Sequence, residues 1–162
     1  MTWETIEAPP GVPPPQPITV RAQSIPARHY FPEHQHRWNQ VVYAISGVLT
    51  VAAERRSAEH FPPKWMPVRR RKGDQINDPR TRSDATESEC VLVISPEQAV
   101  WLPTGLRHRV GSLVGAEFRS LWIADEAGRG LPTSPTVFGV TPLLKALIVE
   151  ATQIERQSDR DG

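Results

Sequence analysis

The sequence is short of cysteine, of long apolar runs and of net charge, and each shortage excludes a class of protein. Its single cysteine, Cys90, cannot close an internal disulfide, which favours a reducing, cytoplasmic setting. No apolar run approaches the ~20 residues that span a bilayer, and Glu4, Glu7 and several prolines stand where a signal peptide would be apolar. A net charge of +1 provides no broad field for nucleic acid or an anionic membrane. We therefore expect a soluble cytoplasmic protein.

The chain also lacks the usual marks of nucleophilic catalysis and of phosphate binding. None of its serines stands in the glycine context of a nucleophile elbow. Cys90 lies in an apolar run, where a thiol is usually inert packing. A glycine-rich phosphate loop is missing as well. Covalent catalysis and nucleotide binding through such a loop are therefore not expected.

Proline and glycine, by contrast, are plentiful and divide the chain into short segments. Seventeen prolines and ten glycines separate short runs of β-branched residues, and sustained helical spacing occurs only near the carboxyl end. A chain of 162 residues forms one domain with a real core. This pattern predicts a mainly β protein, a sandwich or small barrel with a helical appendage.

Composition divides the chain into three parts. Residues 1–16 are rich in proline and are expected to form a flexible, polyproline-like arm. Residues 17–135 form the barrel, interrupted at 52–89 by a charged stretch without apolar period, which we expect to be a disordered insertion. Its basic cluster Arg69–Lys72 suggests either a phosphate or nucleic-acid contact or a solvated loop, and interleaved acidic residues favour the loop. Residues 136–162 form a helix and a tail.

The strands follow from runs of β-branched and aromatic residues between turn signals. The expected strands are 18–21, 28–31, 40–45, 48–51, 90–94, 98–102, 106–110, 117–124 and an edge strand at 136–140. Strands 40–45 and 48–51 are predicted to form a tight hairpin, because Gly47 between them can supply the positive φ of such a turn.

The carboxyl-terminal helix has a clear start and an apolar face. Thr141 provides a capping hydroxyl, and Pro142 suits the first helical position. Apolar residues then recur at helical spacing, at Leu143, Leu144, Leu147, Ile148, Ala151 and Ile154. Such a face usually packs on its own barrel. Because this one exceeds what a small barrel covers, a homodimer contact through the helix is the second interpretation.

Three imidazoles and one amide make the candidate site. His34 and His36 are two residues apart, so strand alternation directs both to one face of a sheet, and Gln40 to the same face if no bulge intervenes. Far downstream, the turn Pro103–Gly105 precedes His108. If the two strands are neighbours, all four side chains converge on one cavity.

These four residues allow two interpretations. Neutral imidazoles at His34, His36 and His108 suit zinc, nickel, copper or iron and leave an open coordination position, with Gln40 as a fourth ligand. An amide is a weak, neutral ligand that lowers metal affinity and makes redox chemistry harder to support. It is also donor and acceptor at once, which suits a small polar effector in a pocket without metal. The sequence leaves metal occupancy open.

Tryptophans complete the candidate ligand site. Trp38 and Trp101 stand close in sequence to the histidines and are expected in the pocket wall. Trp38, Trp101 and Trp122 are interpreted as core and pocket wall rather than as a stacking platform, because aromatic residues on half-buried strands usually pack. The predicted ligand-binding set is His34, His36, Trp38, Gln40, Trp101 and His108.

At these residues the chain resembles the cupin superfamily. The first cupin motif appears as His34, His36, Gln40 and Gly47, with Gln in place of the usual acidic residue, and the second as Pro103, Gly105 and His108. The segments 40–51, 99–110, 119–122 and 142–148 further resemble the amino-terminal sensor domain of AraC-type transcription regulators. The resemblance implies a mainly β cupin barrel, a double-stranded β-helix or jelly roll, with a carboxyl-terminal α-helix.

It also implies a function, with two departures from the family. The family pattern is an effector-sensing and dimerising domain that binds a small polar molecule, with zinc, nickel or iron as an optional metal and no catalytic residues. Such regulators have a short connection at 52–89 and carry two helix-turn-helix units after the sensor, whereas this chain stops at Gly162. The expectation is a truncated or stand-alone sensor that does not hold DNA alone. The alternatives are a small metal-dependent cupin enzyme, an oxygenase or isomerase, and an inactive fragment.

Overall fold

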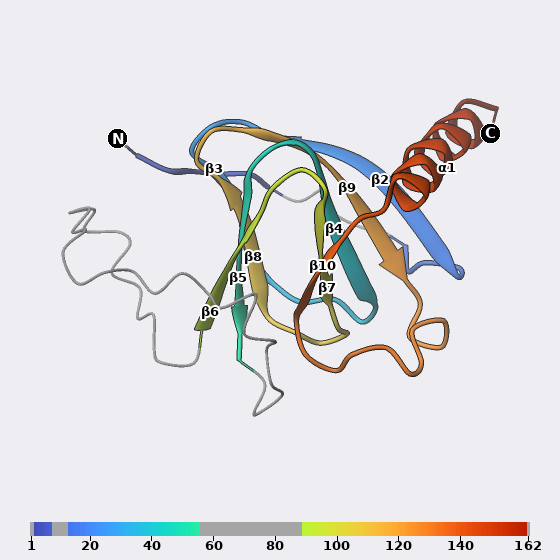
Figure 1. Cartoon of the computed structure of the whole chain (residues 1–162), viewed down its shortest axis with the longest axis horizontal. Coiled ribbons are helices and arrows are strands. Elements are labelled where there is room, and N and C mark those ends of the chain that lie inside the picture. Colours follow the sequence, from blue (N-terminus) through green and yellow to red (C-terminus); the bar gives the residue numbers. More distant parts are fainter. Residues whose placement is uncertain (1, 8–12, 56–88, 162) are drawn as a thin grey trace.

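Two five-stranded sheets face each other, and one helix lies outside them (Figure 1). The computed structural model describes residues 2–7, 13–55 and 89–161. The β8 sheet has the order β1 (Glu4–Thr5), β3 (His29–His34), β8 (His108–Ser112), β5 (Leu49–Glu54) and β6 (Glu89–Ile94). The β4 sheet has the order β10 (Thr136–Gly139), β7 (Gln98–Leu102), β4 (Asn39–Gly47), β9 (Ala116–Ile123) and β2 (Ile18–Ile25). Helix α1 spans Pro142–Asp161.

Successive strands alternate between the sheets. From β2 to β5, and again from β6 to β9, each strand lies in the sheet opposite to that of the strand before it. Neighbouring strands are antiparallel, except that β1 runs parallel to β3. This winding is the double-stranded β-helix of a cupin-type barrel, which confirms the predicted fold class, including the carboxyl-terminal helix. No helix of the described part of the chain has the length and apolar character needed to cross a membrane.

Strand alternation divides the apolar residues between two clusters. On β4, Val42 and Ala44 face the interior between the sheets, where they join the main core of both sheets. Val41 and Tyr43 face the opposite side and pack with Ile148 of α1. The helix therefore covers the outer face of the β4 sheet and leaves the interior to the barrel strands.

Helix α1 begins as predicted, but its apolar face is split. The Thr141 hydroxyl accepts a hydrogen bond from the Leu144 amide at 3.2 Å, which confirms the cap. Leu144 and Ile148 pack against the barrel. Leu143, Leu147 and Ile154 remain 70%, 58% and 58% exposed. Their row lies about 100° around the helix from the docked row, since each residue advances about 100°.

The predicted hairpin at Gly47 is wrong. Gly47 has the expected positive φ, +75°, but β4 pairs with β7 and β9, and β5 pairs with β6 and β8. The turn therefore carries the chain from one sheet to the other. A Cβ at Gly47 would overlap the backbone of Gly115 and Ala116, so this crossing requires glycine for its close contact as well as for its φ.

Two expected segment boundaries also differ. Within the proline-rich arm, Glu4 and Thr5 pair with β3, because this part of the arm precedes the prolines and retains its amide donors. Residues 52–54 of the expected insertion continue β5, and the pairing extends to Glu54 opposite Glu89. Residues 56–88, with the cluster Arg69–Lys72, lie outside the described residues.

Candidate functional site

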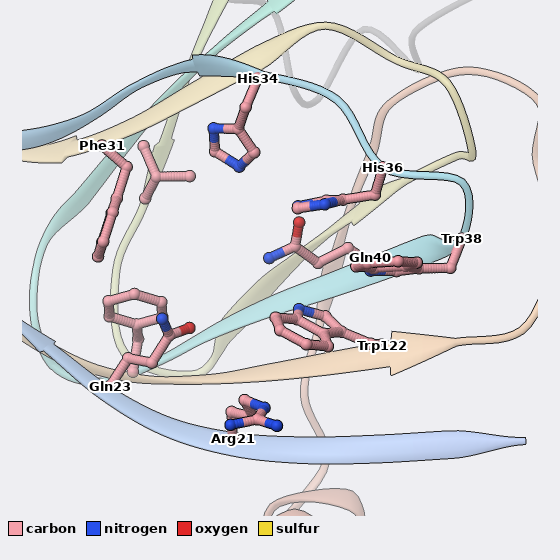
Figure 2. Close-up of a pocket in the computed structure, with 10 residues that line it drawn as sticks. Arg21, Gln23, Phe31, His34, His36, Trp38, Gln40 and Trp122 are labelled. Carbon is pink, nitrogen blue, oxygen red and sulfur yellow. The ribbon is translucent and has the colours of Figure 1, made fainter. Parts of the chain in front are cut away.

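A cavity of about 280 Å³ lies between the two sheets and contains most of the predicted site. Both sheets contribute to its wall, which is part polar and part aromatic (Figure 2). Its lining residues are Arg21, Gln23, Phe31, His34, His36, Trp38, Gln40, Val110, Phe118 and Trp122. None of them is acidic. The cavity is slightly smaller than the ~300–1,000 Å³ of common ligand sites, so it suits a small molecule.

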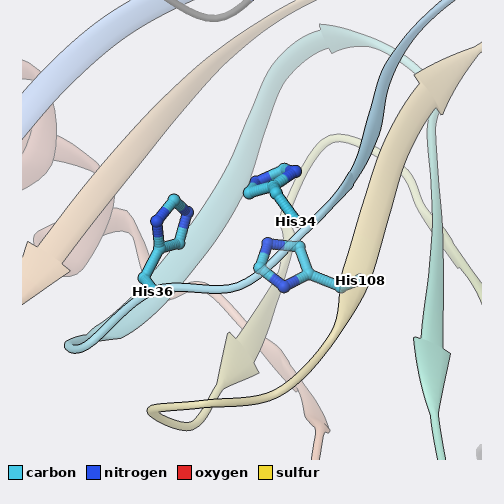
Figure 3. A group of neighbouring side chains, drawn as sticks. All are labelled: His34, His36 and His108. Carbon is cyan, nitrogen blue, oxygen red and sulfur yellow. The ribbon is translucent and has the colours of Figure 1, made fainter. Parts of the chain in front are cut away.

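The three predicted histidines come together at one end of this cavity; His34 and His36 line it, and His108 lies beside both rings without being one of the lining residues. His34 ends β3, and its register partner on the neighbouring strand is His108, which begins β8. The His34 ring lies 4.4 Å from the His108 ring and 4.8 Å from the His36 ring, centroid to centroid, and His36 and His108 are 5.5 Å apart. Figure 3 shows the three rings directed toward one another. The prediction that these imidazoles converge is confirmed.

They do not converge by strand alternation as expected. His34 belongs to the β8 sheet, Gln40 to the β4 sheet, and His36 lies in the link between them. The sequence analysis assumed a single strand from His34 to Gln40, but the chain changes sheets at residues 35–38. The common orientation arises because this crossing turns around the mouth of the cavity, so that residues before, within and after it face inward.

Backbone carbonyls fix the tautomers of two rings. His34 Nδ1 lies 2.7 Å from the Pro32 carbonyl oxygen, and His108 Nδ1 lies 2.9 Å from the Leu106 carbonyl oxygen. Because a carbonyl accepts only, each Nδ1 carries the hydrogen and donates it, and each Nε2 keeps its lone pair. Nε2 of His108 is buried without a hydrogen-bond partner.

Burial keeps two of these rings neutral. Desolvation by burial, followed by the charges of His34 and His108, lowers the pKa of His36 from 6.5 to about 4. The neighbouring Gln40 side chain raises this pKa by a smaller amount. Desolvation also lowers the pKa of His108 to about 4, although the hydrogen bond to Leu106 favours its charged form. Both rings are therefore unprotonated at neutral pH, the form in which imidazole binds a metal or accepts a hydrogen bond.

Gln40 is held by a serine on the neighbouring strand. Its amide nitrogen donates to Ser120 Oγ at 2.6 Å, and Trp122 Nε1 donates to the same oxygen at 3.1 Å. This orients Gln40 Oε1 toward the cavity and the His36 ring (Figure 2). The oxygen is buried and makes no hydrogen bond of good geometry, so it is available to a bound molecule. Ser120 is a site residue that the sequence analysis did not identify.

The aromatic wall differs from the predicted one at one position. Trp38 stacks on His36 at 4.8 Å and 12°, and lies 5.2 Å from Trp122. Trp101 is buried on the other face of the β4 sheet, in the cluster with Ile148, and donates to the Pro132 carbonyl. Trp101 is therefore outside the cavity, because Val100 and Leu102, its neighbours on β7, occupy the inward positions.

The histidine cluster fits the donor set of a transition metal. Its ligand atoms all lie within 4.8 Å of one another. Two nitrogens bound to one tetrahedral zinc at about 2.1 Å lie about 3.4 Å apart, so the most widely separated ligand atoms would have to approach by more than about 1 Å. His34, His36 and His108 would hold the ion, with Gln40 Oε1 as an oxygen ligand. Such an ion supplies an open position that binds or polarises an oxygen ligand.

Comparison with known proteins assigns neither a family nor a function to this chain. No family model matches the sequence, and a search of curated proteins finds no match. Similar solved structures include protein SPY1581 of Streptococcus pyogenes, of unknown function, at 9% identity and a TM-score of 0.44, covering 68% of this chain and 67% of that chain. Protein NMB1881 of Neisseria meningitidis gives 12% identity and 0.43, covering 74% and 89%.

Another similar structure is an enzyme. Oxalate decarboxylase of Bacillus subtilis, which has Mn(II) centres, gives 16% identity and a TM-score of 0.45 over 83% of this chain and 28% of that one. The chain thus spans under a third of the length of this relative. At these identities and TM-scores, no activity or metal of these proteins is assigned to this chain.

Proposed function

We propose that the chain is the cytoplasmic effector-sensing and dimerisation domain of an AraC-type transcription regulator. The strongest support is the presence of unpaired polar atoms at the cavity, which a bound molecule could pair with. Three lining residues have a buried polar atom without a hydrogen-bond partner, namely Arg21 Nε, Trp38 Nε1 and Gln40 Oε1, and His108 Nε2 is unpaired in the adjoining histidine cluster. Since buried polar groups in native proteins are almost always paired, these atoms favour a small polar molecule as their partner.

The composition of the wall supports binding over turnover. No carboxylate lines the cavity, so the candidate general bases in its wall are histidines. Gln40 replaces the acidic residue of the cupin motif and has no proton to transfer in the usual pH range. Regulation would follow from a ligand that binds two states of the barrel and helix with different affinities.

The experiment joins metal analysis to ligand screening of the full chain. Protein purified without added metal is analysed by plasma mass spectrometry. It is then screened by thermal shift against small acids, sugars and their derivatives, with and without zinc, nickel or iron. We expect a ligand that stabilises the wild type and is recovered unchanged by NMR, and we expect no sequence-specific complex in a gel shift with promoter DNA.

Matched variants show whether the ligand that shifts the melting temperature binds in the cavity. His108→Ala and Gln40→Ala should each weaken the response at least about tenfold, because each removes a hydrogen-bond partner and leaves a polar group of the ligand unpaired. His29→Ala, a histidine of β3 outside the cavity, should leave it unchanged. A ligand response equal in all four proteins would contradict the proposal.

The three imidazoles favour the second candidate, a small metal-dependent cupin enzyme such as an oxygenase or isomerase. The same experiment separates the two. Iron or another metal bound stoichiometrically, together with chemical change of the added ligand, would establish the enzyme and overturn the sensor.

A further inference from the structure

Arg21 lies at the end of the cavity opposite the histidines, where its guanidinium rests against an aromatic ring and no acidic residue lines the wall. It extends inward from β2, and Figure 2 shows Trp122 between it and the His36 ring. The guanidinium carbon lies 5.0 Å from the centroid of the Trp122 ring, and Nε is buried without a hydrogen bond. Among the described residues no carboxylate forms an ion pair with Arg21.

Two surface arginines of the barrel, unlike Arg21, have carboxylate partners. Arg107 pairs with Glu33 and Glu54, and Arg109 pairs with Glu89. Pairs on the surface contribute little to stability. Arg21 is half-buried as a residue, but its Nε is buried, and a buried polar group without a hydrogen bond is costly. An arginine without a carboxylate partner inside a cavity thus indicates an anion supplied from outside the chain.

The net charge of the cavity also indicates an anionic ligand. Arg21 keeps its charge at any ordinary pH, and the lining contains no acidic residue to balance it. Gln40 is neutral where the cupin motif has a carboxylate, so a divalent metal at the histidines would add two further uncompensated charges. With or without metal, an anionic ligand is the one that balances the site.

We propose that the cavity takes a small carboxylate with a flat apolar body, its carboxylate bound by Arg21 and Gln23. Gln23 follows Arg21 on the same face of β2 and also lines the cavity. Guanidinium binds carboxylate through two parallel hydrogen bonds. The body contacts the rings of Trp122 and Trp38, and a polar group at its far end meets Gln40 or the histidines. This inference rests on the proposed function and names the class of effector.

Matched ligand pairs test the role of the negative charge. Benzoate and benzamide, and cyclohexanecarboxylate and its amide, are titrated into the full chain by calorimetry. Cyclohexanecarboxylate, whose ring is not flat, should bind more weakly than benzoate, and benzoate should bind at least about tenfold more tightly than benzamide. Arg21→Met should abolish the preference for benzoate over benzamide, and Arg21→Lys should keep part of it. Arg129→Met, at an exposed arginine outside the cavity, should leave it unchanged.

The Arg21 Nε signal in nitrogen NMR spectra gives a second measurement that needs no stable Met variant. The signal is assigned by its loss in Arg21→Lys. It should move when the carboxylate is added and stay when the amide is added. Equal binding of benzoate and benzamide, cyclohexanecarboxylate bound as tightly as benzoate, a preference that survives in Arg21→Met, or no binding of either carboxylate would overturn the inference.

Amide binding that needs His108 and Gln40 would leave the sensor function standing while the anion inference fails. If chemically unrelated ligands also fail to bind, the sensor proposal fails with it.

Discussion

Gln40 determines the charge of the site through a single atom. Its amide keeps the position next to the histidines polar, while Ser120 takes the nitrogen and leaves the oxygen for the cavity. A carboxylate there would neutralise part of a metal's charge, as well as that of Arg21. The amide leaves both charges to be balanced by whatever enters. Because His36 and His108 are neutral in the folded protein, they also make its stability depend on pH in the acid range.

We predict that the metal-free protein loses stability as the pH falls from 6.5 toward about 4. The pKa values of His36 and His108 are about 4 in the folded protein and 6.5 in the unfolded chain. The unfolded state therefore binds protons first, so the stabilisation is complete above 6.5 and declines below it. His108 alone lowers the free energy of unfolding by up to about 1.4 kcal/mol for each pH unit in this range. Urea unfolding of chelator-treated protein across this range measures the loss.

Replacing the ring provides the control for this prediction. His108→Gln should reduce the acid-dependent loss relative to the wild type. A loss of the same size in His108→Gln would contradict the assignment of the effect to His108.

At the scale of elements, the docking of α1 protects an edge of the β4 sheet. Strand β2 is the last strand of that sheet, and the Val20 amide on its open side donates to Glu155 Oε2 at 2.7 Å. Unpaired strand edges are sites of unwanted pairing, and the carboxylate occupies one of their donors. The helix thereby contacts the same strand that carries Arg21 into the cavity.

We predict that Glu155→Ala lowers the free energy of unfolding by about 1–2 kcal/mol, because it leaves the partly buried Val20 amide without an acceptor. Hydrogen exchange of that amide should accelerate. Glu155→Gln, which keeps an acceptor oxygen, should retain most of the protection. Glu150→Ala, at an exposed position of the same helix, is the control, and equal exchange in all variants would refute this role.

Local patterns predicted the elements better than their pairing. The caps at Thr141 and Pro142, the run at 90–94 and the positive φ of Gly47 were recognisable because each depends on neighbouring residues. Pairing was not, since Gly47 marks a turn without specifying whether the chain reverses or crosses to the opposite sheet. The same limit affected the site. Two short motifs indicated the histidines and Gln40, whereas Arg21 and Ser120 reach the cavity only through the register of β2 and β9.

At the scale of the whole molecule, the split face of α1 leaves an apolar row on the surface. Leu143, Leu147 and Ile154 are each more than half exposed, on a helix whose other row is docked. An isolated exposed apolar residue is ordinary, whereas three large ones on one side of a helix mark a contact surface. We propose a second copy of this chain as the partner, packed helix against helix.

We predict that the wild type sediments as a dimer and that Leu143→Glu with Leu147→Glu sediments as a monomer with an unchanged circular dichroism spectrum. Charged residues in the row would be desolvated on pairing without a partner. Leu113→Glu, at an equally exposed apolar residue between β8 and β9, should stay dimeric. A monomeric wild type, or dissociation by Leu113→Glu, would contradict the proposed interface.

The crossing at residues 35–38 has a mechanical consequence. Because it brings His34 from one sheet and Gln40 from the other to the same cavity, an occupant touches both halves of the barrel at once. Its binding free energy then opposes separation of the halves and is added to the stability of the entire domain. Ligand binding in this cavity therefore stabilises the entire domain, and the melting temperature measures occupancy as directly as any local probe.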